Sequence, residues 1–331
     1  MAARRGNELE PGQIEVAGIR RSFWLARAPR PAGSRAAPPL LIALHGSGMD
    51  GRGMAWFTGL ARRGPAAGIT VVFPDGWNGG WHPARVPSAV PGLDDARFLA
   101  ELASHLEWAG AARSWPVFLA GVSHGARYAE HVARHGLLPV TGLFLVAGTG
   151  LAVSRRQVPV PQLRASVALV VGNGDPTFPY QGGRLTRKGM SGFLLKRRAV
   201  RHGELPGEDV VTGAEELAAD WAAANGITTA AGVTVTGSFA RPAIEELPMP
   251  AGEPPVTRIA WSRPGCHPAT LYRIEGGGHG WPGGPQYLPS QAIGPVSRHL
   301  DATGLLLDMA TREAAIASGR TVPGLERWET A

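Results

Sequence analysis

The feature that most constrains the fold is a series of short, continuously apolar runs separated by longer stretches with helical character. Strands of a parallel sheet are buried on both faces, so their sequences are continuously apolar rather than alternating. The pattern is typical of βα units, and it predicts an α/β fold with a mostly parallel central sheet flanked by helices. The expected strands are residues Leu40–Leu44, 69–73, 117–120, 143–146, 167–171 and 270–274.

Further elements are expected around these runs. Residues 14–27 alternate polar and apolar side chains, which indicates an antiparallel pair at the edge of the sheet. Asp94 and Asp95 stand where the first helix begins, and carboxylates there cap free N–H groups and favour the helix dipole. A catalytic role for this acidic pair is the alternative interpretation. The expected helices are residues 93–109, 125–135, 213–225 and 289–303.

The domain organisation is predicted from length and from two irregular stretches. A chain of 331 residues can bury a large core, and its sequence contains no internal repeat. Residues 182–212 are rich in arginine and glycine, and residues 232–266 are rich in proline and read as a strand pair or a loop. We therefore predict one α/β domain over residues 1–331 with these two insertions.

The composition argues against several partners. The formal charge is +7, but the basic residues are almost all arginine and are scattered along the chain; their one cluster, residues 184–201, reads as solvated surface. Nucleic-acid binding is therefore not expected. Cys266 is the single cysteine, which excludes an intrachain disulfide. No apolar run is long enough to span a membrane, and residues 1–13 lack the apolar core of a signal peptide, so the expected location is cytoplasmic, unless an export signal has been removed.

A candidate nucleophile lies in the segment Gly-Val-Ser-His-Gly at 121–125. The pentapeptide alone is weak evidence, because a tight turn with a capping serine has the same sequence. Its context is more specific, since an expected strand ends directly before it and an expected helix begins directly after it. This strand–turn–helix setting is that of a nucleophile elbow, so Ser123 is the predicted nucleophile.

Oxyanion-stabilising N–H groups are expected from two places. One is the residue after the nucleophile, His124, and the other is the loop that follows the strand Leu40–Leu44, where Ser47 is the best candidate. His45, at the start of that loop, precedes the nucleophile in the chain. We interpret it as a residue that braces the loop rather than as the base.

The acid and the base are expected after the nucleophile in the chain, in that order. Asp175 follows the expected strand 167–171, and His279 follows the strand 270–274 and three glycines. Asp175 taken alone could be a turn residue, and His279 taken alone could be a metal ligand. Asp220 is a rival acid, but it falls inside an expected helix.

Taken together, these segments resemble the polyhydroxybutyrate depolymerase and feruloyl esterase group of the α/β-hydrolases. The resemblance implies a Ser123–Asp175–His279 triad that needs no metal or organic cofactor and acts on esters of hydroxy acids or aromatic acids. It also implies that Trp81 and Trp281 form pocket walls. It extends from about residue 40 to residue 284 and rests on residues 45–46, 73–76, 94–99, 121–125, 175–183, 221–226 and 272–284.

The sequence departs from this group in three ways. Ile227 stands where members commonly carry a cysteine, His124 stands where many have a small residue, and the chain shows no export signal. These departures weaken the expectation of an extracellular polymer substrate and make an intracellular esterase for soluble or oligomeric esters a competing hypothesis. The expected activity is that of a serine carboxylic ester hydrolase. Peptidase or acyltransferase chemistry on the same triad, or a hydrolase fold that only binds, are the alternatives.

Overall fold

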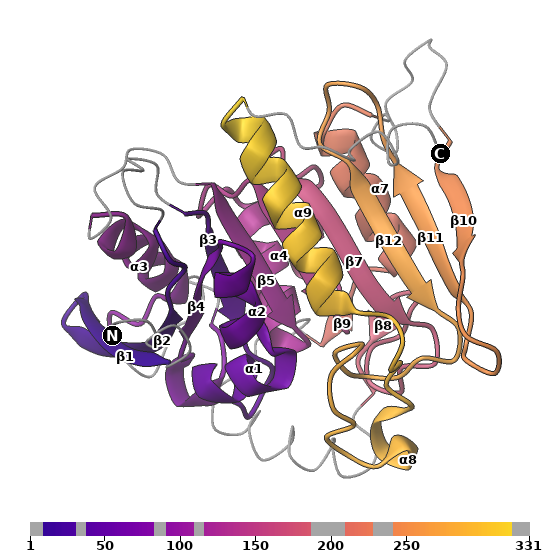
Figure 1. Ribbon diagram of the computed structural model, residues 1–331, viewed down its shortest axis with the longest axis horizontal. Helices are drawn as coiled ribbons and strands as arrows, with labels where there is room; N and C mark the ends of the chain where they lie inside the picture. The colour runs from indigo at the N-terminus through magenta and orange to yellow at the C-terminus, as the bar shows by residue number, and fades with distance from the viewer. Residues whose placement is uncertain are drawn as a thin grey trace, which may run out of the picture.

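The computed structural model describes residues 9–30, 38–82, 91–108, 116–186, 209–227 and 241–319. Its centre is a ten-stranded sheet that crosses the whole molecule (Figure 1). The six middle strands are parallel, and an antiparallel pair flanks them on each side. In spatial order the strands are β1 (Glu10–Val16), β2 (Ile19–Ala26), β4 (Thr70–Pro74), β3 (Leu40–Leu44), β5 (Val117–Val122), β6 (Gly142–Val146), β7 (Ser166–Gly172), β12 (Ala269–Ile274), β11 (Val256–Trp261) and β10 (Ala243–Leu247).

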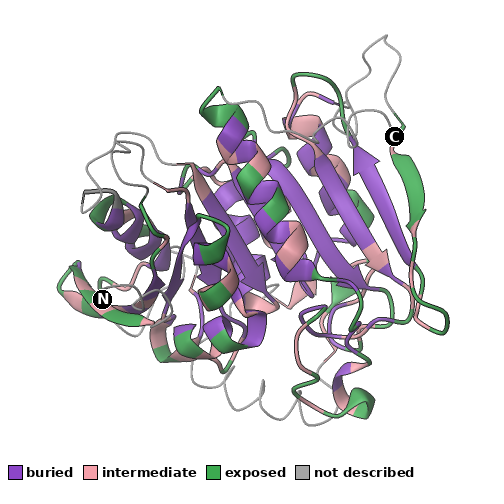
Figure 2. Cartoon of the chain, viewed as in Figure 1, coloured by how far each residue is buried: buried purple, intermediate pink, exposed green. Residues whose placement is uncertain are grey.

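The parallel strands are buried on both faces, as their continuous apolar character predicts. Every residue of β3, β4, β6 and β7 is buried. One face is covered by α3 (Asp95–Trp108), α4 (His124–Arg134) and α7 (Ala214–Ala224), and the other by α1 (Gly51–Thr58), α2 (Leu60–Ala66) and α9 (Ala302–Ala317). Figure 2 shows the middle strands of the sheet as buried and the helices as a mixture of buried and exposed residues. The predicted strands and the first three predicted helices are confirmed to within two residues at most ends.

The helix predicted at 289–303 is wrong. Its residues form only the single turn α8 (Ser290–Ile293), which ends at Gly294 with φ of 74°, and the next residue is Pro295. A proline at that point lacks the N–H that a continuing helix needs. The C-terminal helix is α9, which begins at Ala302, because the Asp301 carboxylate accepts a hydrogen bond from Gly304 N and caps the first turn.

Asp301 also forms a bidentate ion pair with Arg63 of α2, with N–O distances of 2.7 and 2.6 Å. Hydrogen bonding to Arg63 is the main reason that the pKa of Asp301 lies below its usual value. A carboxylate with a lowered pKa stabilises the folded state above the unfolded-state pKa, and this contribution is lost as the pH falls through the folded-state pKa. We therefore expect Asp301→Ala to lower the free energy of unfolding by about 1 kcal/mol at neutral pH.

The pH dependence of this loss of stability distinguishes a missing Asp301–Arg63 ion pair from a simple packing defect. In urea titrations, the difference between the wild type and Asp301→Ala should shrink as the pH falls below about 4. A difference that stays constant from pH 7 to pH 2.5 would contradict the assignment.

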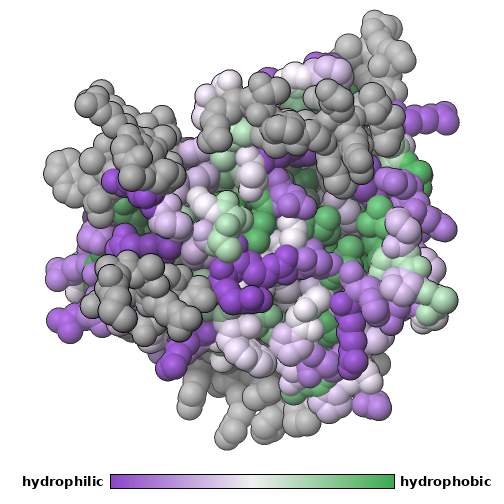
Figure 3. All heavy atoms as spheres, in the orientation of Figure 1, coloured by the Kyte–Doolittle hydropathy of each residue, from purple (hydrophilic) through white to green (hydrophobic). Residues whose placement is uncertain are grey.

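The two predicted insertions differ in what the structure describes. Residues 187–208 and 228–240 lie outside the described residues. Within 182–212, β8 (Gly183–Arg184) and β9 (Val210–Val211) pair as a small separate sheet. Within 232–266, β10 and β11 form a strand pair that extends the main sheet antiparallel to β12. On the face shown in Figure 3, hydrophilic and apolar side chains are intermingled among the described residues.

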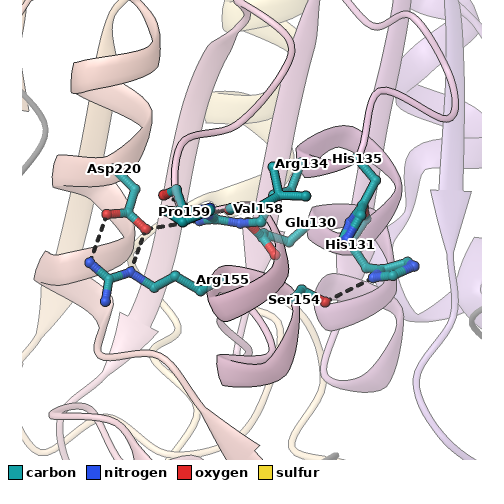
Figure 4. A network of polar contacts seen from close by, with 9 residues as sticks. All are labelled: Glu130, His131, Arg134, His135, Ser154, Arg155, Val158, Pro159 and Asp220. Atoms are coloured by element: carbon teal, nitrogen blue, oxygen red, sulfur yellow. Dashed lines mark hydrogen bonds and ion pairs between the residues drawn. The ribbon is translucent and has the colours of Figure 1, made fainter.

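A buried network of charged side chains links α4 to the neighbouring helices (Figure 4). Arg134 of α4 donates to Glu130 at 2.6 Å, to Asp220 of α7 at 3.0 Å and to the carbonyl oxygens of Val158 and Pro159. Arg155 of α5 (Ala152–Gln157) donates to the same Asp220. Asp220, the rival acid in the sequence, is therefore the centre of an ion-pair network.

Candidate active site

A sharp turn at Ser123 joins β5 to α4. Its backbone lies at φ 56° and ψ −118°, a strained conformation for a residue with a side chain. The turn is possible because glycines flank it at close approaches. A methyl group on Gly121 would lie 2.4 Å from the carbonyl carbon of Gly125, and one on Gly125 would lie 2.4 Å from the carbonyl oxygen of Leu44. The hydroxyl group is thus presented at the carboxyl edge of the sheet, at the N-terminus of α4.

The structure brings Ser123, His279 and Asp175 together in one hydrogen-bonded chain. His279 Nε2 lies 2.9 Å from Ser123 Oγ, and His279 Nδ1 lies 2.8 Å from Asp175 Oδ2. The three residues follow β5, β12 and β7, which are near neighbours in the sheet and end at the same edge. An imidazole between a hydroxyl and a carboxylate can take the hydroxyl proton while the carboxylate fixes its tautomer.

The loops around the acid and the base hold both in place. The second oxygen of Asp175 accepts hydrogen bonds from the backbone N–H groups of Thr177 and Phe178, at 2.7 and 2.9 Å. The backbone N–H of His279 donates to the carbonyl oxygen of Ile293 at 2.5 Å. The side chains of Asp175 and His279 are 3% and 9% exposed, so the pair is shielded from bulk water while Ser123 is half-buried.

Ser47 and His124, the residues expected to supply oxyanion-stabilising N–H groups, lie on the two segments that flank the hydroxyl. His124 is the first residue of α4, where backbone N–H groups have no partner within the helix. The loop with Ser47 passes close to the elbow. A methyl group on the neighbouring Gly46 would lie 3.5 Å from Ser123 Cβ. The oxyanion role of these two N–H groups stays a prediction.

His45 braces this loop. Its Nδ1 lies 2.8 Å from the carbonyl oxygen of Gly46, and its Nε2 accepts from the backbone N–H of Gly76 at 2.9 Å. These contacts require the neutral tautomer with the proton on Nδ1. The side chain is fully buried, which fits a structural role and not that of the base.

The structure places the two tryptophans predicted as pocket walls in the core. Trp281 is fully buried, and its indole N–H donates to Thr303 at 2.9 Å. Trp81 is 2% exposed, stacks on Tyr128 and donates to the carbonyl oxygen of His45. Both rings are turned inward by these hydrogen bonds, so we assign neither of them a contact with substrate.

The acidic pair at 94–95 has structural contacts. Asp94 accepts from the backbone N–H of Arg97 at 2.9 Å and thereby caps α3. Asp95 is fully buried, forms an ion pair with Arg21 and accepts from His82. The capping interpretation is consistent with these contacts.

Sequence reasoning missed Phe178, which lies against the imidazole. Its ring is nearly parallel to that of His279, with ring centroids 5.4 Å apart and planes 8° apart. The guanidinium carbon of Arg127, one turn after Ser123 on α4, lies 5.9 Å from the centroid of the Phe178 ring. Phe178 is buried and holds the plane of the imidazole while its backbone holds Asp175.

We expect Phe178→Leu to lower kcat/KM by about three- to tenfold, because a stacked ring contributes about 0.5–1.5 kcal/mol beyond its burial. Phe178→Tyr keeps the ring and should retain most of the activity. Phe23→Leu is the matched control, since Phe23 is an equally buried phenylalanine on β2. Equal losses of kcat/KM in Phe178→Leu and Phe23→Leu would contradict a positioning role.

Neither a metal site nor a membrane span is found within the described part of the chain. No group of three or more histidine, cysteine, aspartate or glutamate side chains there could hold a metal ion. No described helix is both long and apolar enough to cross a bilayer.

The parallel sheet with helices on both faces and the serine elbow after β5 define the α/β-hydrolase fold. A solved structure with a similar fold is the acetyl xylan esterase from Aspergillus awamori, which superposes with a TM-score of 0.51 over 82% of this chain and 94% of the other at 13% identity. In sequence, the chain is 27% identical over 304 residues to a protein from Nocardia uniformis subsp. tsuyamanensis named "Putative esterase NocK". That alignment covers 89% of this chain and 80% of the relative. No protein-family profile matches the chain.

Proposed function

We propose that this protein is a serine hydrolase that cleaves carboxylic esters through an acyl-enzyme. The observation that carries the proposal is the hydrogen-bonded chain from Ser123 Oγ through His279 to Asp175, with distances of 2.9 and 2.8 Å. The similarity to a relative named as an esterase supports the same reaction class.

In the proposed mechanism, His279 accepts the proton of Ser123 as the hydroxyl oxygen attacks the ester carbonyl. The N–H groups of Ser47 and His124 stabilise the negative charge that develops on the carbonyl oxygen. His279 then donates its proton to the leaving alcohol, and Asp175 stabilises the imidazolium in the meantime. A water molecule, deprotonated by His279, then attacks the acyl carbonyl, and His279 returns the proton to Ser123 Oγ as the carboxylic acid is released.

The substrate class that we propose follows from the resemblance to polyhydroxybutyrate depolymerases and feruloyl esterases. Esters of hydroxyalkanoic or aromatic acids are the first candidates, in soluble or oligomeric form. Support for this finer proposal rests on motif similarity at 175–183 and 272–284. No metal or organic cofactor is required by the steps above.

The test is hydrolysis of p-nitrophenyl acetate and p-nitrophenyl butyrate, combined with labelling by a fluorophosphonate probe. The wild type should hydrolyse both esters and carry the probe on Ser123, as located by peptide mass spectrometry. A panel of hydroxybutyrate oligomers, methyl ferulate and matched amides, compared by kcat/KM, then separates the ester classes from peptidase activity. Absence of labelling at Ser123 in folded protein would rule the proposal out.

A further inference from the structure

The loops that carry the acid and the base leave the sheet side by side. β7 and β12 are parallel neighbours, and their pairing ends at Gly172 and Ile274 (Figure 1). The two loops stay hydrogen-bonded beyond that point, because Gly174 N donates to the carbonyl oxygen of Gly277 at 3.1 Å. A methyl group on Gly172 would lie 2.0 Å from that same carbonyl oxygen, so the two backbones approach too closely for a side chain there.

Few side chains are available to fix the paths of these loops. Asn173 stands between two glycines, directly before the Gly174–Asp175 step. On the other loop, three successive glycines separate Glu275 from His279. Glycine has more backbone freedom than any other residue, so contacts from outside the run must hold the segment that leads to His279.

The carboxamide of Asn173 joins the two loops. Its Oδ1 accepts a hydrogen bond from Gly276 N at 2.6 Å, and its Nδ2 donates to Glu275 Oε2. Glu275 is held in turn, because its other oxygen accepts from Arg273 Nε at 2.6 Å. A carboxamide suits this place, since it offers an acceptor and a donor side by side, whereas a carboxylate offers acceptors only.

The backbone N–H groups of the glycine run show what this side chain adds. The N–H groups of residues 277–279 donate to the backbone carbonyl oxygens of Ile274, Pro295 and Ile293, in that order. Within this described segment, the N–H of Gly276 is the one that a side chain accepts. Asn173 therefore ties the start of the glycine run to the loop that carries Asp175.

We propose that Asn173 is a positioning residue that sets the distance between Asp175 and His279 by clamping together the loops that carry them. The inference rests on the proposed serine-hydrolase function, because the position of His279 affects turnover only if His279 is the base. Asn173 is exposed, so truncating its side chain leaves no cavity. It acts through the two loop backbones and takes no part in proton transfer, so its loss should lower kcat and leave KM unchanged.

The test begins with two substitutions assayed with p-nitrophenyl acetate. Asn173→Ala removes both hydrogen bonds of the clamp and should lower kcat by about fivefold. Asn173→Asp should lower kcat by about tenfold, because it sets a second carboxylate against that of Glu275.

A second substitution should rescue Asn173→Asp. In Asn173→Asp/Glu275→Gln the donor and the acceptor exchange sides: the new amide donates to the new carboxylate, which still accepts from Gly276 N. The amide oxygen replaces the Glu275 oxygen that accepts from Arg273. The kcat of this double variant should return to within about twofold of the wild type.

A measurement without any ester reports the geometry directly. The low-field proton NMR resonance of the hydrogen bond between His279 Nδ1 and Asp175 should shift upfield or vanish in Asn173→Ala and Asn173→Asp, and it should return in the double variant.

The matched control is Asn225→Ala. The buried Asn225 carboxamide bonds to the backbone of Ala165 and His267, which precede β7 and β12, so it links the opposite ends of the same two strands. Its loss should lower the melting temperature while leaving the resonance and kcat unchanged.

The outcomes separate the clamp from the esterase. The inference is overturned by wild-type kcat and resonance in Asn173→Ala, by a loss of kcat at an unchanged resonance, or by a double variant no better than Asn173→Asp. A resonance that depends on Asn173, in a protein that hydrolyses no ester, would uphold the clamp and reject the proposed function. Ester hydrolysis with kcat and resonance independent of Asn173 would do the reverse.

Discussion

Replacing Ser123 with alanine is expected to lower kcat for ester hydrolysis by about a millionfold, with little change in thermal stability. The substitution removes only the hydroxyl group, which is the proposed nucleophile in a chain of hydrogen bonds to His279 and Asp175. His279→Ala should lose about as much, because without the base the serine is not deprotonated. Asp175→Ala should lose less, on the order of 10⁴-fold, since the base remains but is no longer oriented.

The combination of these changes tests whether the three residues act as one unit. The double variant Ser123→Ala/His279→Ala should be no slower than either single variant, because each single change already removes the whole relay. The measurement is kcat with p-nitrophenyl acetate, together with the melting temperature of each variant. Multiplicative losses in the double variant would show that the residues act independently and would contradict the mechanism.

The parts of the fold that sequence could predict are those fixed by local pattern. The strands β3, β4, β6 and β7 are buried on both faces, so their apolar runs identified them directly. The elbow at Ser123 was predictable for a similar reason, since a strand, two glycines and a helix follow one another without interruption. Residues at the carboxyl ends of parallel strands meet at one edge, so the positions of Asp175 and His279 directly after two such strands indicated that they would lie close together.

What sequence could not predict depends on contacts between distant loops. The indole of Trp81 points inward because its N–H donates to the carbonyl oxygen of His45, 36 residues earlier. Phe178 is an ordinary aromatic residue in sequence, and its place beside His279 arises only when the loops after β7 and β12 pack together. The helix predicted at 289–303 does not form, because α8 ends at Gly294 and the Asp301 cap begins a separate helix at Ala302.

The second large effect is expected from the buried network behind the elbow: Arg134→Met should lower the free energy of unfolding by about 3–5 kcal/mol. The Arg134 side chain is 1% exposed. It forms ion pairs with Asp220 and with Glu130, whose side chain is fully buried. Methionine fills much of the volume but leaves both carboxylates without this partner. Because α4 carries Ser123 at its start, the variant tests how firmly the network holds that helix.

Burial already raises the pKa of Glu130 in spite of Arg134, and losing the arginine should raise it further. A carboxyl group with a raised pKa in the folded state stabilises it at low pH and loses that contribution as the pH rises through the folded-state pKa. The loss of unfolding free energy in Arg134→Met, measured by urea unfolding, should therefore be larger at pH 8 than at pH 5.

Arg155→Met is the matched control, because it removes a second arginine from the same Asp220. The Arg155 side chain is 31% exposed, so its loss should lower the free energy of unfolding by no more than about 1 kcal/mol. Equal deficits for the two variants, independent of pH, would show that the buried charge of Glu130 is not what Arg134 stabilises.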